Sequence, residues 1–307
     1  MASSISRLGI INFIGQILHS DNISAIDVSN DFLVIGADEG NRVQILKRQG
    51  EDYAVVSDIT LNASAKEIDI EGIACDGNTV YVVGSHSAKR PKIDKDATYE
   101  TNRQNIKKVD SEPDRDRLFR FSLDADGHAQ NLEETSLRSM IDSKKVLKDF
   151  SLLPSKENGV DIEGIAIHNE QLYVGFRGPV LRENWVPVLK CRFAKPMTEA
   201  ELVYVRLDGL GFRDITRVED GFLILAGPVG DGPGAFQVYF WDGEDCLPGV
   251  RASGKTGRIE YLGVIPTDEG AKAEGLTLLK ESSSGYEVAI VFDGLKNGSP
   301  TRFGIAK

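Results

Sequence analysis

Asp161-Ile162-Glu163-Gly164-Ile165-Ala166 begins with acidic residues, continues as an apolar β-strand and leads through a short turn into a second strand. Nearly the same order of residues stands at Asp69-Ile70-Glu71-Gly72-Ile73-Ala74, and a shorter version at Ala273-Glu274-Gly275-Leu276. Fainter copies begin near Ile23 and Phe212. Internal repeats of this length are typical of propellers, solenoids and arrays, and they outweigh local structural preferences.

Each copy contains short strands rich in Val, Ile and aromatic residues, separated by Asp, Asn and Gly turn residues. The last copy has room for only three strands, so we expect a strand within residues 10–18 to complete it and remove an exposed sheet edge. We therefore predict one all-β domain over residues 1–307, a five-bladed β-propeller with four-stranded antiparallel blades. A β-sandwich is the alternative, but it gives no reason for the acidic start to recur. The expected blades are residues 23–62, 69–137, 160–208, 212–265 and 273–307, with a helix-like interlude at residues 140–149.

Composition limits the possible partners. The 307 residues include 47 acidic and 36 basic ones, a net charge of −11, which argues against nucleic acid or an anionic membrane as the main partner. Three widely spaced cysteines suit a reducing compartment and argue against a disulfide framework. Neither a secretory signal nor a membrane-spanning run is evident. We expect a cytoplasmic protein that is a monomer.

An acidic ring is predicted at the propeller axis. Aligning the copies on their second strands brings one oxygen-bearing residue per blade to the same inner position: Ser24, Glu71, Glu163, Asp214 and Glu274. Carboxylates this close need either protons or a cation among them. An all-oxygen ring selects a hard cation, and calcium, with its tolerant geometry, fits better than magnesium. Alternatively, these residues hydrogen-bond backbone amides at the strand starts and the channel holds only water.

The same face receives the ends of the second strands and the longest insertion, residues 87–116. Asp38, His86, Arg177 and Asp293 stand at these strand ends, and a loop of such length is usually functional or disordered. Basic side chains there could frame an anionic small molecule above the cation; alternatively the charged loop is a solvated surface. These basic residues are Lys89, Arg90, Lys92, Lys107, Lys108, Arg177, Arg182 and Arg213.

Two resemblances follow from these motifs. The repeated Asp-Ile-Glu-Gly-Ile-Ala, with Gly84-Ser85-His86-Ser87, Arg117 to Phe121 and Gly175 to Pro179, resembles a family of bacterial propeller proteins of unknown function. The ring is also similar to that of the calcium-dependent nucleotidases of the apyrase type, five-bladed propellers that hydrolyse nucleoside di- and triphosphates. Asp214 departs from the smaller hydroxyl residue of that family, and its nucleotide-binding residues have no match here. The resemblance therefore implies the fold and the metal more than the substrate.

Two functions stay open. In the first, which we favour, the protein is a calcium-dependent hydrolase of a phosphate ester or another anionic small molecule. Arg177 would stabilise negative charge, His86, Asp69 or Asp161 would move the proton, and Asp38, Arg213 and Asp293 would contact the substrate. In the second, a non-catalytic propeller binds a ligand or protein on the same face and the cation only holds the blades together.

Overall fold

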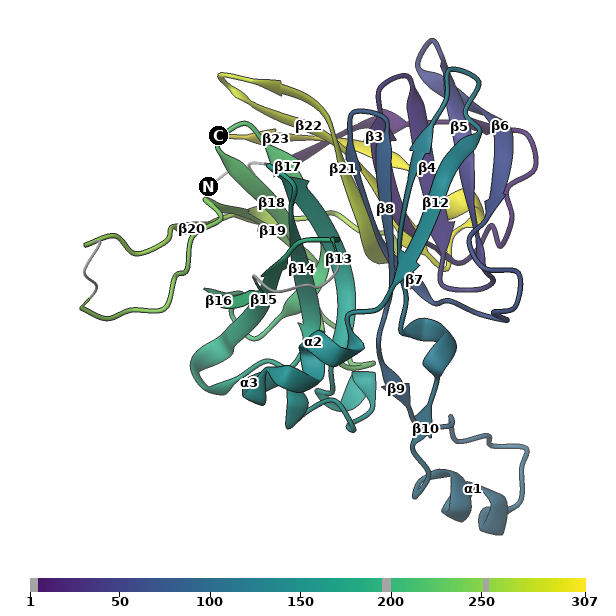
Figure 1. The fold of residues 1–307 in the computed structure, drawn as a ribbon, viewed down its shortest axis with the longest axis vertical. Helices are drawn as coiled ribbons and strands as arrows, with labels where there is room; N and C mark the ends of the chain where they lie inside the picture. Colours follow the sequence, from purple (N-terminus) through teal and green to yellow (C-terminus); the bar gives the residue numbers. More distant parts are fainter. Residues whose placement is uncertain (1–4, 195–199, 251–253) are drawn as a thin grey trace.

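The computed structural model describes residues 5–194, 200–250 and 254–307. Five antiparallel sheets are arranged around one axis, so the predicted five-bladed propeller is confirmed (Figure 1). In the first four blades the four blade strands run outward from the axis in chain order, and in the fifth β1 is the outer strand. The first blade contains β3 (Ile23–Ser29), β4 (Phe32–Ala37), β5 (Arg42–Gln49) and β6 (Asp52–Thr60); the second contains β7 (Ile70–Asp76), β8 (Thr79–Gly84), β11 (Leu118–Leu123) and β12 (Ala129–Thr135).

The remaining blades follow the same plan. The third contains β13 (Asp161–His168), β14 (Gln171–Gly178), β15 (Trp185–Cys191) and β16 (Glu201–Arg206). The fourth contains β17 (Gly211–Val218), β18 (Gly221–Gly227), β19 (Gln237–Trp241) and β20 (Ile259–Val264). The fifth contains β21 (Lys272–Ser282), β22 (Gly285–Asp293), β23 (Thr301–Ala306) and, as its outer strand, β1 (Ile5–Ile10).

Apolar side chains on both faces of each sheet explain the arrangement. The buried apolar residues form five clusters, each filled from two neighbouring blades, such as Ile45 with Phe121 between the first and second. The inner strands β3, β7, β13, β17 and β21 contact one another in a closed circle. Burial of this apolar surface is the main favourable term that holds the blades together.

The position of the closing strand corrects one prediction. Ile5–Ile10, rather than a strand within residues 10–18, pairs with β23, with Ile5 opposite Ile305 and Ile10 opposite Thr301. The next residues instead return to the first blade, where β2 (Phe13–Ile14) pairs in parallel with β6. Ile11, Phe13 and Ile17 are buried between the fifth and first blades, whereas most of β1 is exposed. The apolar signal therefore marked the buried connection, and the outer strand itself carries little apolar pattern.

The insertion after β8 forms an arm that extends away from the blades (Figure 1). It contains β9 (Ala88–Lys89), α1 (Tyr99–Asn105), β10 (Asp110–Ser111) and the 3-10 turn η1 (Pro113–Arg115). The helix-like interlude is present as α2 (Arg138–Ser143) and α3 (Lys145–Lys148). Three further 3-10 turns are η2 (Ser155–Glu157), η3 (Arg182–Asn184) and η4 (Lys296–Gly298). No helix in the described part of the chain is long and apolar enough to cross a membrane.

Candidate functional site on the propeller axis

A β-bulge at the same place in all five inner strands builds the site. At each bulge one residue has no partner in the neighbouring strand, and its side chain is released from the ladder. The residue after the bulge is small in four of the five strands, because it lies against the next blade. A Cβ on Gly164, for example, would lie 2.8 Å from Cα of Asp214. The five bulge residues are Ser24, Glu71, Glu163, Arg213 and Glu274.

The register corrects one member of the predicted ring. The bulge of β17 lies between Phe212 and Asp214, so Arg213 occupies the ring position and Asp214 the following one. The Asp214 carboxylate accepts hydrogen bonds from Ile215 N (2.8 Å) and from Leu276 N of the next blade (2.6 Å). Asp214 therefore joins two blades through their backbones, which is the structural alternative considered for the ring residues.

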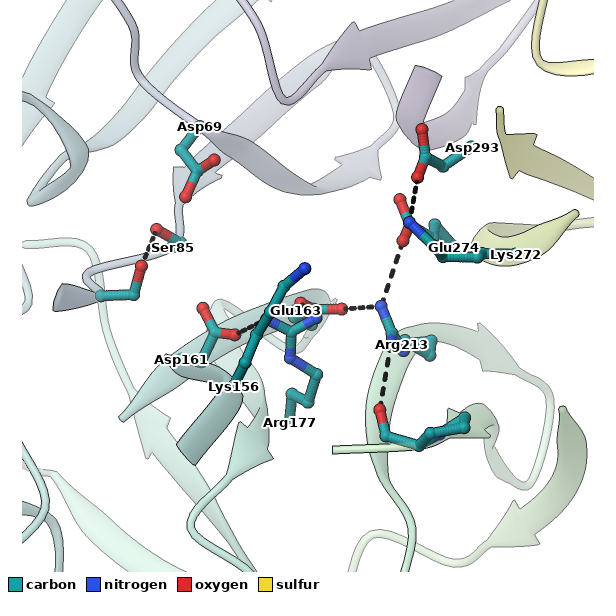
Figure 2. A network of polar contacts seen from close by, with 12 residues as sticks. Asp69, Ser85, Lys156, Asp161, Glu163, Arg177, Arg213, Lys272, Glu274 and Asp293 are labelled. Atoms are coloured by element: carbon teal, nitrogen blue, oxygen red, sulfur yellow. Dashed lines mark hydrogen bonds and ion pairs between the residues drawn. The ribbon is translucent and has the colours of Figure 1, made fainter. Parts of the chain in front are cut away.

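Arginine side chains supply the positive charge within the ring. Arg213 Nη1 donates to Glu163 Oε2 (3.0 Å) and to Glu274 Oε1 (3.1 Å), as Figure 2 shows. Arg177 Nη1 lies 2.8 Å from Glu163 Oε1, and its Nη2 pairs with Asp161. All these groups are buried, so the pairs are little screened by salt. The network leaves Glu163 fully occupied by two guanidinium groups.

Although the charge of Arg177 is close enough to act on it, Glu71 is the ring carboxylate that forms no ion pair with the described residues. Its side chain forms no hydrogen bond or ion pair with the part of the chain that the structure describes, although solvent reaches it. Burial, followed by the charges of Glu163, Asp69, Glu274 and Asp38, raises the pKa of Glu71 well above its usual range. Glu71 is therefore the ring position at which an added positive charge would be most stabilising.

Asp38 has the same character at the edge of the site. Its Oδ1 atom is buried without a hydrogen-bond partner among the described residues. Burial, Asp69 and Asp293 raise the pKa of Asp38 to about 7. Burial also raises the pKa of Glu274 to about 8, although Arg213 opposes the shift. Asp38 and Glu274 are therefore partly protonated near neutral pH.

The other acidic residues at the site are ion-paired. Asp69 lies 2.7 Å from Arg115 Nη1, and Asp293 lies 2.7 Å from Lys272 Nζ. Burial raises the pKa of Asp161 to about 8, although Arg177 opposes the shift. Arg115 and Lys272 were not expected from the sequence. Lys272 stands two residues before Glu274 on an inner strand, a spacing that places both near the axis, whereas nothing in the sequence distinguishes Arg115.

The network contains more carboxylates than cations. Arg115, Arg177, Arg213 and Lys272 are the basic side chains that pair with its acidic ones. We refer to the seven carboxylates together with these four cations as the axial acidic site; the carboxylates are Asp38, Asp69, Glu71, Asp161, Glu163, Glu274 and Asp293.

His86 and Ser24 face the backbone. Leu137 N donates to His86 Nε2 (3.0 Å), so the ring proton lies on Nδ1, which donates to Gly84 O (2.9 Å). Burial lowers the pKa of His86 to about 4. With both nitrogens used, His86 has none free for a ligand on the axis, and it anchors the base of the arm instead. Ser24 Oγ donates to Ile70 O of the second blade (2.5 Å).

The type and placement of the donor atoms decide whether the site can hold a metal ion. All the available donors are oxygens, which suits calcium. However, no three His, Cys, Asp or Glu side chains of residues 5–194, 200–250 and 254–307 are gathered as a ready metal site. Glu163 is occupied by arginines, which leaves Glu71, Asp38 and the second oxygens of Asp69 and Glu274 as candidate ligands. These residues could hold a hard cation only after their side chains turn toward one another.

A separate hollow of about 320 Å³ lies at the opposite end of the blades. It is lined by the turns after β3, β7 and β11, including Asn30, Asn78 and Asp124, and by Lys47 of β5. None of the residues of the axial acidic site contributes to it. The hollow and the concentration of buried charge thus point to different places, and the buried charge is the stronger indicator of function.

Comparison with known proteins defines the class and the family. A family model described as "Protein of unknown function (DUF3616)" matches residues 22–302. The chain therefore belongs to this family of propeller proteins, in agreement with the first resemblance. No curated protein matches the chain. The similarity to apyrase-type nucleotidases stays a prediction.

The solved structures that this chain resembles have very different sequences. Glutaminyl cyclase from Myxococcus xanthus is 11% identical, covers 99% of this chain and 97% of its own, and has a TM-score of 0.51. The aldose sugar dehydrogenase of Streptomyces coelicolor, in its PQQ-bound form, is 9% identical over 98% and 97% of the two chains, with a TM-score of 0.47. The Nup133 β-propeller domain of Vanderwaltozyma polyspora is 10% identical over 95% and 72%, with a TM-score of 0.42. At such identities the likeness extends to the fold alone.

Proposed function

We propose that the axial acidic site binds a cationic ligand, with calcium as the first candidate. The observation that carries this proposal is Glu71, a ring carboxylate that forms no ion pair with the described residues and is close enough to Asp38, Asp69, Glu163 and Glu274 to be affected by their charges. An added cation would offset this charge and displace the protons that now do so. A protonated amine is also positively charged and needs fewer converging ligands. It is therefore the second candidate ligand.

The arginine pairs support a binding role over hydrolysis. Arg177 and Arg213 are both paired with Glu163, so carboxylates of the site already offset the charge that an anionic substrate would need. Truncating one member of such a buried pair commonly costs about 3–5 kcal/mol, so the pairs are expected to persist. The structure thus favours the non-catalytic propeller with a bound cation. Hydrolysis of a phosphate ester stays a prediction from the sequence.

Thermal unfolding of chelator-treated protein tests the proposal. Calcium, magnesium and a simple alkylamine are added separately to the full chain and to Glu71→Gln. At about 100 times Kd, binding adds about 2.7 kcal/mol to the free energy of unfolding. For a chain of this size, that gain corresponds to a rise in Tm of roughly 5 °C.

The matched control is Glu170→Gln on the exposed turn between β13 and β14, at the opposite end of this hairpin from Asp161 and Glu163. We expect the control to respond to calcium as the native protein does and Glu71→Gln to respond weakly. A rise with the amine and none with calcium would identify an amine site. No rise with any cation, or an equal rise in Glu71→Gln, would contradict the proposal.

A further inference from the structure

The arm (residues 88–112) is ordered but largely uncovered. Helix α1 buries none of its residues. The large apolar side chains on and beside it are unusually exposed: Ile93 by 55%, Tyr99 by 75% and Ile106 by 58%. Exposed apolar groups that gather on one projecting element commonly mark an interaction surface.

Local contacts nevertheless fix the conformation of the arm. Thr98 caps α1 by accepting from Thr101 N (3.1 Å), and Asn102 Nδ2 donates to Asp94 O (2.6 Å). Arg90 Nη1 donates to Lys108 O (3.1 Å), and its Nη2 donates to Glu157 Oε2 (2.8 Å) at the base. A helix of seven residues is marginal in water unless something packs against it. We therefore expect another molecule to pack against the exposed surface of the arm.

The charge of the arm indicates which kind of surface packs against it. Residues 88–112 contain seven Lys or Arg and five Asp or Glu, a net charge of +2 in a chain of −11, so the remaining residues carry −13. Four of the basic residues form no ion pair within the described part of the chain: Lys92, Lys95, Arg103 and Lys107. The arm is thus a basic, partly apolar element on an otherwise acidic molecule.

The face from which the arm rises offers a complementary surface. Glu39 and Asp231, on loops at the strand ends that surround the axial acidic site, have side chains that are 58% and 75% exposed. Each also lies beside a basic side chain of its own chain, Glu39 3.5 Å from His19 Nδ1 and Asp231 2.5 Å from Lys156 Nζ. Leu152 and Leu153, in the loop before β13 on the same face, are 82% and 41% exposed. This face therefore combines acidic loops with exposed apolar side chains, matching the two components of the arm.

We propose that this chain self-associates, with the arm of one copy lying across the acidic face of a second copy. Reciprocal exchange of two arms gives a closed two-fold dimer, the commonest arrangement of identical chains. The apolar residues of the arm meet the Leu152 region, and its free lysines meet the acidic loops. This proposal differs from the monomer expected from the sequence.

Sedimentation velocity of the full chain over a range of concentrations tests this inference. We expect a concentration-dependent dimer at about 0.1 M salt that weakens at about 1 M salt, because the Debye length falls from roughly 10 Å to roughly 3 Å. Ile106→Ser and Lys107→Glu should each weaken the dimer by about tenfold or more, or about 1.4 kcal/mol. Neither side chain is buried, so both variants should fold normally.

Matched controls place equivalent changes elsewhere. Leu132→Ser on β12, 41% exposed, and Lys280→Glu on β21, which is also exposed, should dimerise as the native protein does. A native protein that stays monomeric throughout, or arm variants that dimerise like the native chain, would overturn the inference. Calcium titration of monomeric Ile106→Ser keeps this result separate from the cation-binding proposal, which does not require the dimer.

Discussion

At the scale of single residues, the central feature is that guanidinium groups occupy positions predicted for a metal ion. Arg213 stands in the ring itself, and Arg177 reaches Glu163 from the adjoining strand β14. Guanidinium groups suit this role because they keep their charge when buried and can contact two carboxylates at once. Glu71 and Asp38 are the carboxyl groups of the site that form no ion pair with the described residues, and burial and neighbouring carboxylates raise the pKa of both.

Replacement of Arg213 tests how much this network contributes to the stability of the fold. Arg213→Met would leave Glu163 and Glu274 without a shared cation in a buried place, so we expect a loss of about 3 kcal/mol or more. Chemical denaturation measures the change in the free energy of unfolding. The double variant Arg213→Met/Glu274→Gln should recover part of the loss, because it removes one of the uncompensated charges. A single variant as stable as the native chain would contradict the assigned role.

Asp38 predicts how stability depends on pH. Its pKa rises from the usual range near 4 to about 7 on folding, so the folded state binds the proton more tightly. Asp38 therefore favours folding at low pH and loses this contribution as the pH rises through about 7. Asp38→Asn should be more stable than the native protein at pH 8, by roughly 1–2 kcal/mol, and the difference should shrink at pH 5. Denaturation across this range measures it, with exposed Asp126→Asn as the control. A constant difference would count against the raised pKa.

At the scale of elements, the repeated motif predicted the fold because each copy has the same structural task. Glu-Gly in β7, β13 and β21 combines a bulge residue at the axis with a small residue against the next blade. In β17 the same positions hold Arg213 and Asp214. Matching the apolar residues around them, Phe212 and Ile215, would have found Arg213; matching carboxylates instead selected Asp214. The ion pairs of Arg115 and Lys272 depend on contacts between blades, which the sequence alone does not specify.

The close approach of the inner strands gives a prediction for Gly164. A Cβ there would lie 2.8 Å from Cα of Asp214 and 3.0 Å from Ile215 N, both backbone atoms that move only with the whole strand. Gly164→Ala should therefore destabilise the protein by about 1–3 kcal/mol. Thermal or chemical unfolding measures it. Gly232→Ala, with open space around its Cβ, is the control and should be neutral. Equal stability of both variants would show that the blades can separate without cost.

At the scale of the molecule, the two ends of the chain meet in the fifth blade. β1 supplies the outer strand beside β23, so the propeller closes through hydrogen bonds between strands from opposite ends of the sequence. Ile5 is buried in the apolar cluster between the fourth and fifth blades.

Ile5→Ala should weaken this closure. Loss of a buried isoleucine side chain typically costs about 2–5 kcal/mol, and an edge strand lies toward the low end. Chemical denaturation of Ile5→Ala and of Leu8→Ala, whose side chain on the same strand is 49% exposed, separates burial from strand pairing. A loss in Leu8→Ala as large as that in Ile5→Ala would contradict this account.

The most direct test of the cation-binding proposal is calorimetric titration of calcium into chelator-treated protein at pH 7, in two buffers with different ionisation enthalpies. Because Asp38, Glu71 and Glu274 have raised pKa values, a bound cation should displace protons, and the apparent enthalpy should depend on the buffer. Glu71→Gln should bind calcium much more weakly. Absence of binding to the native protein, or binding with neither proton release nor dependence on Glu71, would contradict calcium binding at this site.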